Sequence, residues 1–367
     1  MDKLSHLFES NVKVFEAPKV FNAAQFTSPG SKLEIKEVEW VHPKEGEIVV
    51  KVFSVGLHST DEIVKHGLLP HLKYPITPGS SFSGEVVQIG VGVKHFKIGH
   101  NVIGVCAHGA LAEYAVVNAD YVVELKKREG PTQFSYVECF EGGRVEAELR
   151  RFEKEQKELS RDETHRRNDA NERLGYHGHG IDIVIGDGGA ARIAVQVLKA
   201  TSIHKVQRII VITSNDRWNA AFYDVEPSEL LLTSHNDLAG ALKAIGGVRF
   251  AVAVNQPDDA FDQILEAMRY SSELVVLAPS HNHKLHVPLA PIVAKALSIR
   301  GAVWPDKVSL EKVLELVDRH ALHVSVNRYK FDQEEINKAW EDLEIKTKFD
   351  QPVVIVCETI QAQEVHH

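Results

Sequence analysis

A short glycine turn between an apolar strand pattern and a helix pattern most constrains what this chain can fold into. Residues 181–185 read Ile-Asp-Ile-Val-Ile, residues 186–191 read Gly-Asp-Gly-Gly-Ala-Ala, and a helix is expected over 191–200. Further apolar strands, separated by helical patterns, are expected at 208–213, 250–254 and 274–278. Apolar strands that alternate with helices predict an α/β fold whose doubly wound parallel sheet is buried on both faces.

The glycine turn is also a candidate site for the pyrophosphate of a dinucleotide. Gly186 would allow the tight turn, Gly188 would let the backbone approach the pyrophosphate, and Ala191 would let the helix pack closely on the sheet. The start of the helix adds N–H donors and positive potential. Asp187 would repel a pyrophosphate unless its carboxylate points away, and the turn could also bind nothing. The candidate cofactor-binding residues of the turn are Gly186, Gly188, Gly189, Ala190 and Ala191.

The residues that follow the next strand indicate which dinucleotide to expect. An acid there favours the ribose hydroxyl of NAD, whereas small hydroxyls with a basic residue accommodate the 2′-phosphate of NADP. The chain offers Thr213, Ser214 and Arg217 without an acid at the first position, which favours NADP(H), with NAD(H) still possible. The alternative is that residues 215–216 cap a helix and Arg217 is a solvated charge. Ala278, at the end of a later strand, completes the candidate cofactor-binding set.

Residues 30–125 show a different pattern, in which short apolar runs are punctuated by glycine and proline. The runs lie at 47–53, 84–90, 101–106 and 112–117. Glycine-bounded strands at this density predict a small β-barrel. In the tail we expect a strand at 322–326, an amphipathic helix at 334–343 and a strand at 352–356. We expect the tail to return to the barrel domain.

A polar region, 127–178, separates the two patterns. Sparse apolar positions on a charged helix are expected at Val145, Leu149, Phe152 and Leu159. Residues 160–173 are almost wholly polar, which predicts a mobile loop.

Composition excludes several classes of protein. With 367 residues the chain is long enough for two domains. A net charge of −9 and a pI near 6.1 argue against a nucleic-acid or anionic-membrane partner. No apolar stretch reaches the length of a membrane span, and the start of the chain does not read as a secretion signal. Three widely spaced cysteines exclude a disulfide framework and a four-cysteine zinc lobe, so a cytoplasmic location is expected.

Several segments together resemble the medium-chain dehydrogenase/reductase family. Residues 90–102 look like its "VGxxVxxxKxGDRV" segment, residues 109–117 like "GxFAEYxxV", and residues 287–301 like the "VKxLxIxGS" region of the yeast-type alcohol dehydrogenases. The resemblance implies a GroES-like β-barrel catalytic domain (1–160 and 318–367) and a Rossmann dinucleotide-binding domain (161–317), with 127–178 atypical. It also implies a homodimer joined through an edge strand at 298–303.

The zinc ligands of the alcohol dehydrogenases are not kept. Where their loop reads "GVCHTDxHxxxG", His58 stands in place of the cysteine, and Ser80 and Ser81 replace the histidine and glutamate of "GHE". The third ligand would fall near Cys139, although another register places Phe140 there. A catalytic zinc needs three strong ligands, so no zinc is expected. The "NxxDxYxRxG" signature of the zinc-free quinone reductases is also missing, because His58 and Ile63 hold its asparagine and tyrosine positions.

His58 and Thr60 remain as catalytic candidates. An imidazole next to a hydroxyl could form a short acid–base relay, because neutral imidazole transfers protons well near pH 7. The alternative is a loop histidine that only packs or hydrogen-bonds locally.

Two functions fit the sequence. The first is a zinc-independent NAD(P)H-dependent oxidoreductase that acts on a small molecule with a carbonyl or an activated alkene, since no metal polarises the substrate. The second is a catalytically inactive family member that serves as a binding or scaffold protein, with 127–178 as a candidate partner surface. An active zinc enzyme whose ligands align differently is a third reading. Cofactor binding separates the first two.

Overall fold

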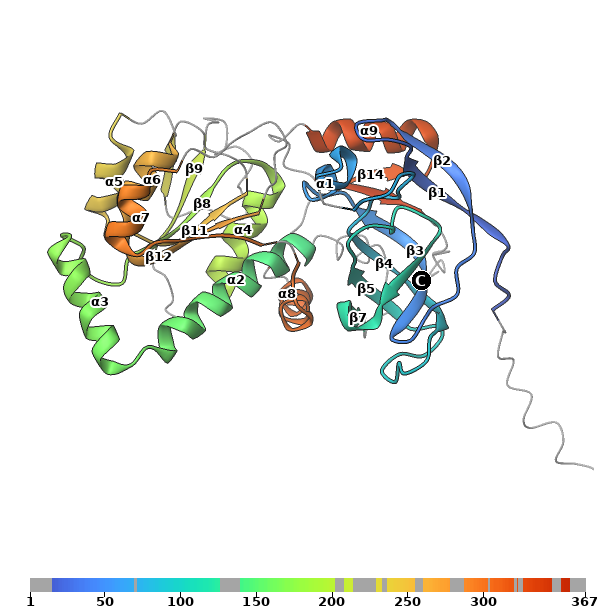
Figure 1. Cartoon of the computed structure of the whole chain (residues 1–367), viewed down its shortest axis with the longest axis horizontal. Coiled ribbons are helices and arrows are strands. Elements are labelled where there is room, and N and C mark those ends of the chain that lie inside the picture. The colour runs from blue at the N-terminus through green and yellow to red at the C-terminus, as the bar shows by residue number, and fades with distance from the viewer. Residues whose placement is uncertain are drawn as a thin grey trace, which may run out of the picture.

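The computed structural model places the chain in two lobes, a parallel-sheet lobe and an antiparallel β-barrel lobe (Figure 1). The described residues are 15–68, 71–125, 139–201, 208–213, 229–232, 236–254, 260–277, 287–302, 304–319, 322, 326–344 and 351–356.

The barrel lobe is built from the first part of the chain and the tail. Its elements are β1 (Val20–Phe26), β2 (Leu33–Glu39), β3 (Glu47–Gly56), α1 (Asp61–His66), β4 (Ser81–Ile89), β5 (Asn101–Val105), β6 (Tyr114–Asn118), a short 3-10 helix (Ala119–Tyr121), β7 (Val122–Glu124), β14 (Val326–Lys330), α9 (Gln333–Glu344) and β15 (Gln351–Ile355). The main sheet has the order β14-β15-β3-β4-β5-β7, with β6 also paired to β3. Because β15 pairs antiparallel with β3, the predicted return of the tail to the barrel is confirmed.

The other lobe contains the predicted parallel sheet. Its elements are β8 (Ile181–Ile185), α4 (Gly188–Thr201), β9 (Ile209–Thr213), β10 (Glu229–Leu232), α5 (Leu238–Ala244), β11 (Val248–Ala253), α6 (Phe261–Ala267), β12 (Met268–Val276), α7 (Leu289–Lys295), β13 (Ser298–Gly301) and α8 (Lys307–Asp318). All pairings in the order β10-β9-β8-β11-β12-β13 are parallel. The predicted fold class, a barrel plus a doubly wound sheet, is confirmed. Of the strand expected at 322–326, only the ends are described, and Val326 begins β14.

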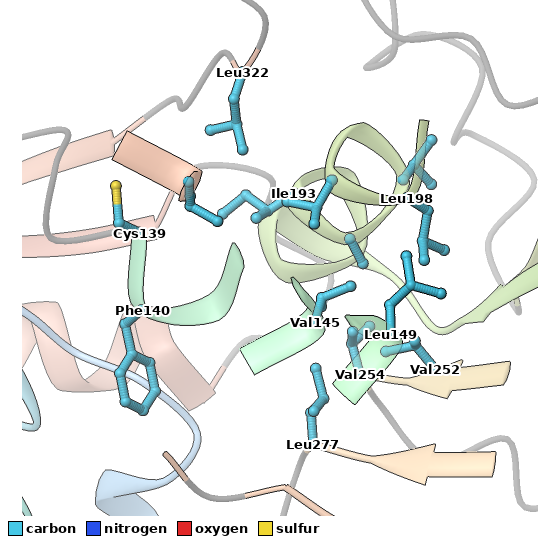
Figure 2. Close-up of a cluster of buried hydrophobic side chains, with 14 of the residues drawn as sticks. Cys139, Phe140, Val145, Leu149, Ile193, Leu198, Val252, Val254, Leu277 and Leu322 are labelled. Atoms are coloured by element: carbon cyan, nitrogen blue, oxygen red, sulfur yellow. The ribbon is translucent and has the colours of Figure 1, made fainter. Parts of the chain in front are cut away.

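The charged helix expected in the middle region is α2 (Cys139–Glu158), and it is part of the core. The predicted apolar positions Val145, Leu149 and Phe152 are buried, and α2 packs against α4 and α8. The fourth predicted position, Leu159, follows the end of the helix and is only partly buried. Figure 2 shows Val145 and Leu149 among side chains of α4 and of the parallel strands. This face of the region is therefore not the free partner surface that the sequence suggested.

The mobile loop predicted at 160–173 is wrong, because these residues form helix α3 (Arg161–Arg173). A capping box begins the helix. The Ser160 hydroxyl accepts from the Glu163 backbone N–H at 3.2 Å, and the Glu163 carboxylate accepts from the Ser160 backbone N–H at 2.8 Å. These reciprocal hydrogen bonds pair backbone N–H groups at the start of the helix, which would otherwise bond only to water.

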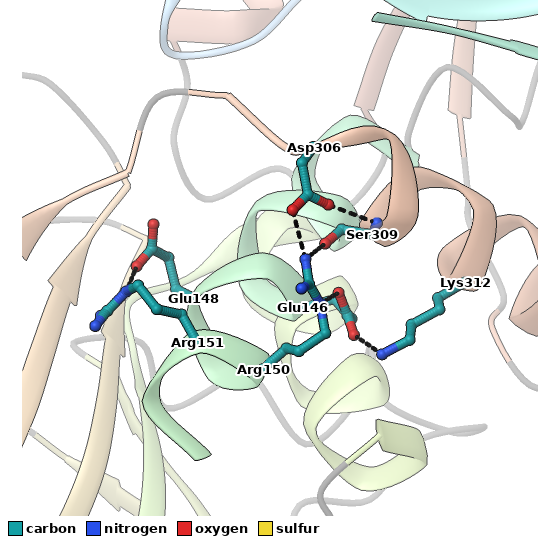
Figure 3. A network of polar contacts seen from close by, with 7 residues as sticks. All are labelled: Glu146, Glu148, Arg150, Arg151, Asp306, Ser309 and Lys312. Carbon is teal, nitrogen blue, oxygen red and sulfur yellow. Dashed lines mark hydrogen bonds and ion pairs between the residues drawn. The ribbon is translucent and has the colours of Figure 1, made fainter. Parts of the chain in front are cut away.

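Charged side chains of α2 fasten it to α8 (Figure 3). The Glu146 carboxylate accepts from Lys312 at 2.6 Å and lies 3.3 Å from the Arg150 guanidinium. Arg150 also donates to Asp306 at 2.5 Å and to Ser309 at 3.0 Å. The high charge of this segment thus serves contacts within the lobe. Among the helices described, none is long and apolar enough to cross a membrane.

Candidate active site

The loop that carries His58 is fixed by one buried carboxylate. β3 ends at Gly56, and α1 begins at Asp61. The Asp61 carboxylate accepts from the backbone N–H groups of His58 and Gly79, both at 2.9 Å. Burial raises the pKa of Asp61, while the neighbouring His58 and these hydrogen bonds act to lower it. The bonds join the loop before α1 to the segment that enters β4, so that His58 faces the start of that strand.

Both ring nitrogens of His58 face polar side chains. Nε2 lies 2.7 Å from the Ser81 hydroxyl, and Nδ1 lies 3.4 Å from a carboxylate oxygen of Glu141. The ring of Phe140 packs 4.4 Å from the imidazole, centre to centre. Gly56 makes room for this arrangement, because a Cβ there would lie 2.6 Å from the Ser81 hydroxyl and 2.8 Å from Nε2. His58 and Ser81 are each 1% exposed.

Glu141 is held in turn by Arg144, one turn further along α2. Their side chains are 3.0 Å apart, and Arg144 also donates to the carbonyls of Leu277 and, at 2.6 Å, Ala302. Burial opposes ionisation of Glu141, but Arg144 and His58 outweigh it and hold the pKa of the carboxyl at about 2. Glu141 is therefore a carboxylate at neutral pH, and a polar chain runs Ser81–His58–Glu141–Arg144.

This chain joins the two lobes at the edge of the parallel sheet where the strands end. Leu277 directly follows β12, and Ala302 directly follows β13. The glycine turn follows β8 at the same edge, and β11 separates β8 from β12. A molecule that extends along this edge from the glycine turn would therefore approach the end of β12, where Arg144 and Glu141 lie.

The glycine turn has the backbone that the sequence predicts. Gly186 and Gly188 have φ values of 123° and 80°, in the region that favours glycine, and α4 begins at Gly188. Gly189 and Ala191 are buried, and Ala190 is partly buried. The carboxylate of Asp187 accepts a hydrogen bond from the buried Thr213 hydroxyl. Ser214, Arg217 and Ala278 lie outside the described residues.

Thr60 does not take the place expected for it. Its hydroxyl lies 3.3 Å from that of Ser80, and the Ser80 hydroxyl lies 3.4 Å from the Asp61 carboxylate. The structure thus pairs His58 with Ser81 and places Thr60 in the network that holds the loop. Glu141 and Arg144 were not predicted as site residues. Their only signal was an acid and a base three residues apart at the start of a helix, a spacing that puts them on one face.

The comparisons with known proteins agree with this architecture. The sequence profile of the alcohol dehydrogenase GroES-like domain matches residues 44–127. An alcohol dehydrogenase of Geobacillus stearothermophilus is 25% identical over 353 residues, which cover 88% of this chain and 95% of that protein. The chain thus contains a GroES-like domain of the alcohol dehydrogenase type and is similar to an alcohol dehydrogenase along most of its length.

Quinone oxidoreductases are also among the similar proteins. The chloroplast envelope quinone oxidoreductase homolog of Arabidopsis thaliana is 34% identical over 126 residues, which cover 32% of this chain and only 38% of that protein. The structure of Escherichia coli quinone oxidoreductase complexed with NADPH has a TM-score of 0.70 at 19% identity, and covers 91% of this chain and all of that one. A structure described as an NAD-dependent alcohol dehydrogenase has a TM-score of 0.71 at 18% identity, over 92% and 100% of the two chains.

The side chains around His58 do not fit the zinc ion that some medium-chain dehydrogenases/reductases carry. Nε2 is engaged by Ser81, Nδ1 faces Glu141, and the serines at 80 and 81 are neutral, weak ligands. Glu141 is already held by Arg144, whose charge would oppose a cation there. In the part of the chain that is described, no three His, Cys, Asp or Glu side chains are grouped so as to hold a metal ion.

Proposed function

We propose that this medium-chain dehydrogenase/reductase is an NAD(P)H-dependent oxidoreductase that works without zinc and reduces a carbonyl or an activated alkene. The observation that carries the proposal is the Ser81–His58–Glu141–Arg144 chain at the sheet edge that also holds the glycine turn. The turn at 186–191 would hold the pyrophosphate of the dinucleotide, whose nicotinamide supplies the hydride when it is bound.

The residues of the chain have distinct roles in moving the proton. When His58 is doubly protonated, the Ser81 hydroxyl gives its proton to the substrate oxygen or carbon and takes one from Nε2. This leaves His58 as neutral imidazole, which regains a proton from water when the site opens. Glu141 lies beside Nδ1, where its negative charge orients the ring and stabilises a positive charge on it. Arg144 keeps Glu141 ionised and in place, so it is a positioning residue. Because His58 and Ser81 are buried, a substrate reaches them only when the site opens, as in enzymes with closing lobes.

The test combines cofactor binding with turnover. We expect a saturable change in nicotinamide fluorescence on binding, and NADPH oxidation with a member of a panel of enones, quinones and aldehydes that survives treatment with a chelator. Ser81→Ala and His58→Gln should lower kcat by about 10²–10⁴, the usual contribution of a positioned acid, and leave the Kd of NADPH unchanged. Ser83→Ala is the matched control, because this buried serine bonds to Ser54 at 2.6 Å, away from the imidazole. Lack of any saturable nicotinamide binding would refute the proposal.

Cofactor preference can be tested in the same assay. On the sequence evidence we propose NADP(H), with Arg217 beside the 2′-phosphate. Arg217→Gln should then weaken the binding of NADPH by roughly tenfold or more, since a charge-assisted hydrogen bond is lost, and should change the binding of NADH little. Equal effects on the two cofactors would contradict the assignment.

One observation favours the alternative of a binding protein without turnover. Asp187 lies buried within the glycine turn, where a carboxylate adds negative charge close to the place of a pyrophosphate. Thr213 shares a hydrogen bond with it but does not neutralise it. Asp187→Asn separates the two functions. If the carboxylate only reduces the affinity for NADPH, this variant binds NADPH more tightly and stays active. If the site has no catalytic activity, neither the variant nor the parent chain turns over substrate.

We also propose that the protein forms a homodimer through β13. This strand is the exposed edge of the parallel sheet, and α7, the helix before it, has the exposed side chains Leu289 and Val293. Leu289→Lys combined with Val293→Lys should halve the mass measured by light scattering. Val91→Lys, at an equally exposed valine of the barrel lobe, should not change it. The cytoplasmic location stays a prediction.

A further inference from the structure

A cavity lies at the edge of the parallel sheet where the strands begin, opposite the edge that holds the glycine turn. It has a volume of about 450 Å³ and is walled by the end of α2, by α3, by the loop 176–179 and by the first residues of β11 and β12. Since the glycine turn follows the end of β8, this cavity is separate from the proposed dinucleotide site. Figure 1 shows α2 running from the junction of the lobes to α3 at the far side of the sheet lobe.

Three guanidinium groups, of Arg167, Arg249 and Arg269, line this cavity. Of the three, only Arg249 has a carboxylate within ion-pair distance among the residues that the structure describes. Asp182 accepts from it at 2.9 and 2.7 Å, and Glu153 lies 3.7 Å away. Its charge is therefore balanced within the protein.

Arg269 is buried without such a partner. It is 8% exposed and donates to the carbonyls of His177 at 3.2 Å, Gly178 at 2.9 Å and Gly246 at 2.8 Å. Across the described part of the chain no carboxylate oxygen lies within ion-pair distance of it or of Arg167. Leaving a charge buried and unbalanced costs several kcal/mol in typical proteins. Carbonyl groups fix the guanidinium in place but cannot neutralise it.

The cations also repel one another. Burial lowers the pKa of Arg269, and the charges of Arg167 and Arg249 lower it further; burial and Arg249 do the same for Arg167. The ring of Tyr176 contacts both Arg269 and the buried Lys295, whose charges lie 5.7 and 5.8 Å from the ring centre. The lining includes one acid, Glu172, which is exposed.

The walls that hold these cations are fixed by hydrogen bonds between α3 and the sheet. The Asn171 amide donates to the carbonyl of Arg167 at 3.0 Å, and its oxygen accepts from the backbone N–H of Tyr270 at 2.8 Å. α3 is thus attached to β12, and Arg167 is presented from a fixed helix. Two neighbouring guanidinium groups that are not paired with carboxylates are an arrangement that proteins use to recognise planar or tetrahedral oxyanions.

We propose that this cavity binds a small phosphate monoester, whose phosphate is held by Arg167 and Arg269. Two unbalanced positive charges match a phosphate monoester, which carries nearly two negative charges at pH 7. The volume exceeds that of inorganic phosphate and lies within the usual range of small-molecule sites, so the organic part of the ester also finds room. The lining rings of Phe152 and Tyr270 and the amides of Gln156 and Asn168 provide apolar and polar contacts for it.

The test is thermal denaturation and calorimetry of the full chain with glucose 6-phosphate, at constant ionic strength. This ester has no nucleotide part, so its binding does not report on the proposed dinucleotide site. We expect a saturable rise in Tm, with inorganic phosphate and succinate binding more weakly. Arg167→Gln should weaken binding by about tenfold or more. Arg166→Gln is the matched control, with the same charge change at an exposed neighbour outside the lining.

The Tm of each variant without ligand distinguishes a loss of binding from a loss of stability. Arg167→Gln removes repulsion, so its Tm without ligand should equal or exceed that of the parent chain. If Arg167→Gln fails to fold, Arg167→Lys keeps the positive charge but lacks the planar guanidinium group. This variant should bind the ester several-fold more weakly than the parent chain. No saturable shift, equal binding by the Arg167 and Arg166 variants, or succinate binding more tightly than the ester would each overturn the proposal.

Discussion

Arg144 offers the most direct test of how the two lobes are held together at the candidate site. It is one of the largest fully buried side chains, and it donates to Glu141 and to carbonyls that follow β12 and β13. Arg144→Met fills a similar space but removes all of these donors. The Glu141 carboxylate would then stay buried without its main counter-charge.

Two properties of the Glu141–Arg144 pair indicate how much stability Arg144→Met should lose. Breaking a buried ion pair by removing one partner typically costs about 3–5 kcal/mol. Arg144 is also the main group that holds the pKa of the buried Glu141 carboxyl at about 2, so removing it leaves this carboxylate without the charge that stabilises it most. His58 shares this stabilisation, but the two lost carbonyl contacts add to it. We therefore expect Arg144→Met to lower the free energy of unfolding by about 3–4 kcal/mol.

Urea unfolding at pH 7, followed by circular dichroism, measures this loss. Arg150→Met is the control on the same helix, because its guanidinium is one-third exposed and its ion pairs should be worth less than about 1 kcal/mol. Adding Glu141→Gln to Arg144→Met removes the unbalanced charge and should recover about 1–2 kcal/mol. A loss below about 1 kcal/mol for Arg144→Met, or no recovery in the double variant, would refute the reasoning.

Three further predictions concern pH, thiol reactivity and packing. Because the folded pKa of Glu141 lies below its ordinary value, its stabilisation is complete above pH 4.5 and is lost as the pH falls toward about 2; Glu141→Gln should flatten the fall in stability measured across that interval. Burial, with a further contribution from the charge of Asp61, raises the pKa of the Cys106 thiol to about 12. Iodoacetamide at pH 8 should therefore modify this thiol far more slowly in the native chain than in the unfolded chain. Equal rates of modification, measured by peptide mass spectrometry, would contradict the raised pKa. Gly84→Ala should lower the free energy of unfolding by about 1–3 kcal/mol or more, because the added Cβ would lie 2.3 Å from the Lys51 carbonyl oxygen. Gly301→Ala, on another strand with open space around it, should change the urea midpoint little. Similar midpoints for the two variants would show that the close contact at Gly84 relaxes freely.

The sequence alone determined the two folding patterns and the glycine turn that follows the strand at 181–185. Apolar runs, glycines and helix periodicity are local properties, so the strands near 181–185 and 209–213 and the positions Val145, Leu149 and Phe152 on one helix face could be predicted from them. Local signals were also available for α3, since Ser160 and Glu163 form a capping box, but the polar composition outweighed them in the prediction.

Only the tertiary structure decided which polar groups meet. His58 and Ser81 come from neighbouring parts of the barrel, whereas Glu141 and Arg144 come from a helix of the other lobe. No spacing in the sequence relates them, because their contacts depend on how the two lobes and α2 pack. The same holds for Arg167 and Arg269, which come together because α3 is attached to the start of β12. Periodicity fixes the elements, while burial of charge, which depends on the packed whole, selects the site residues.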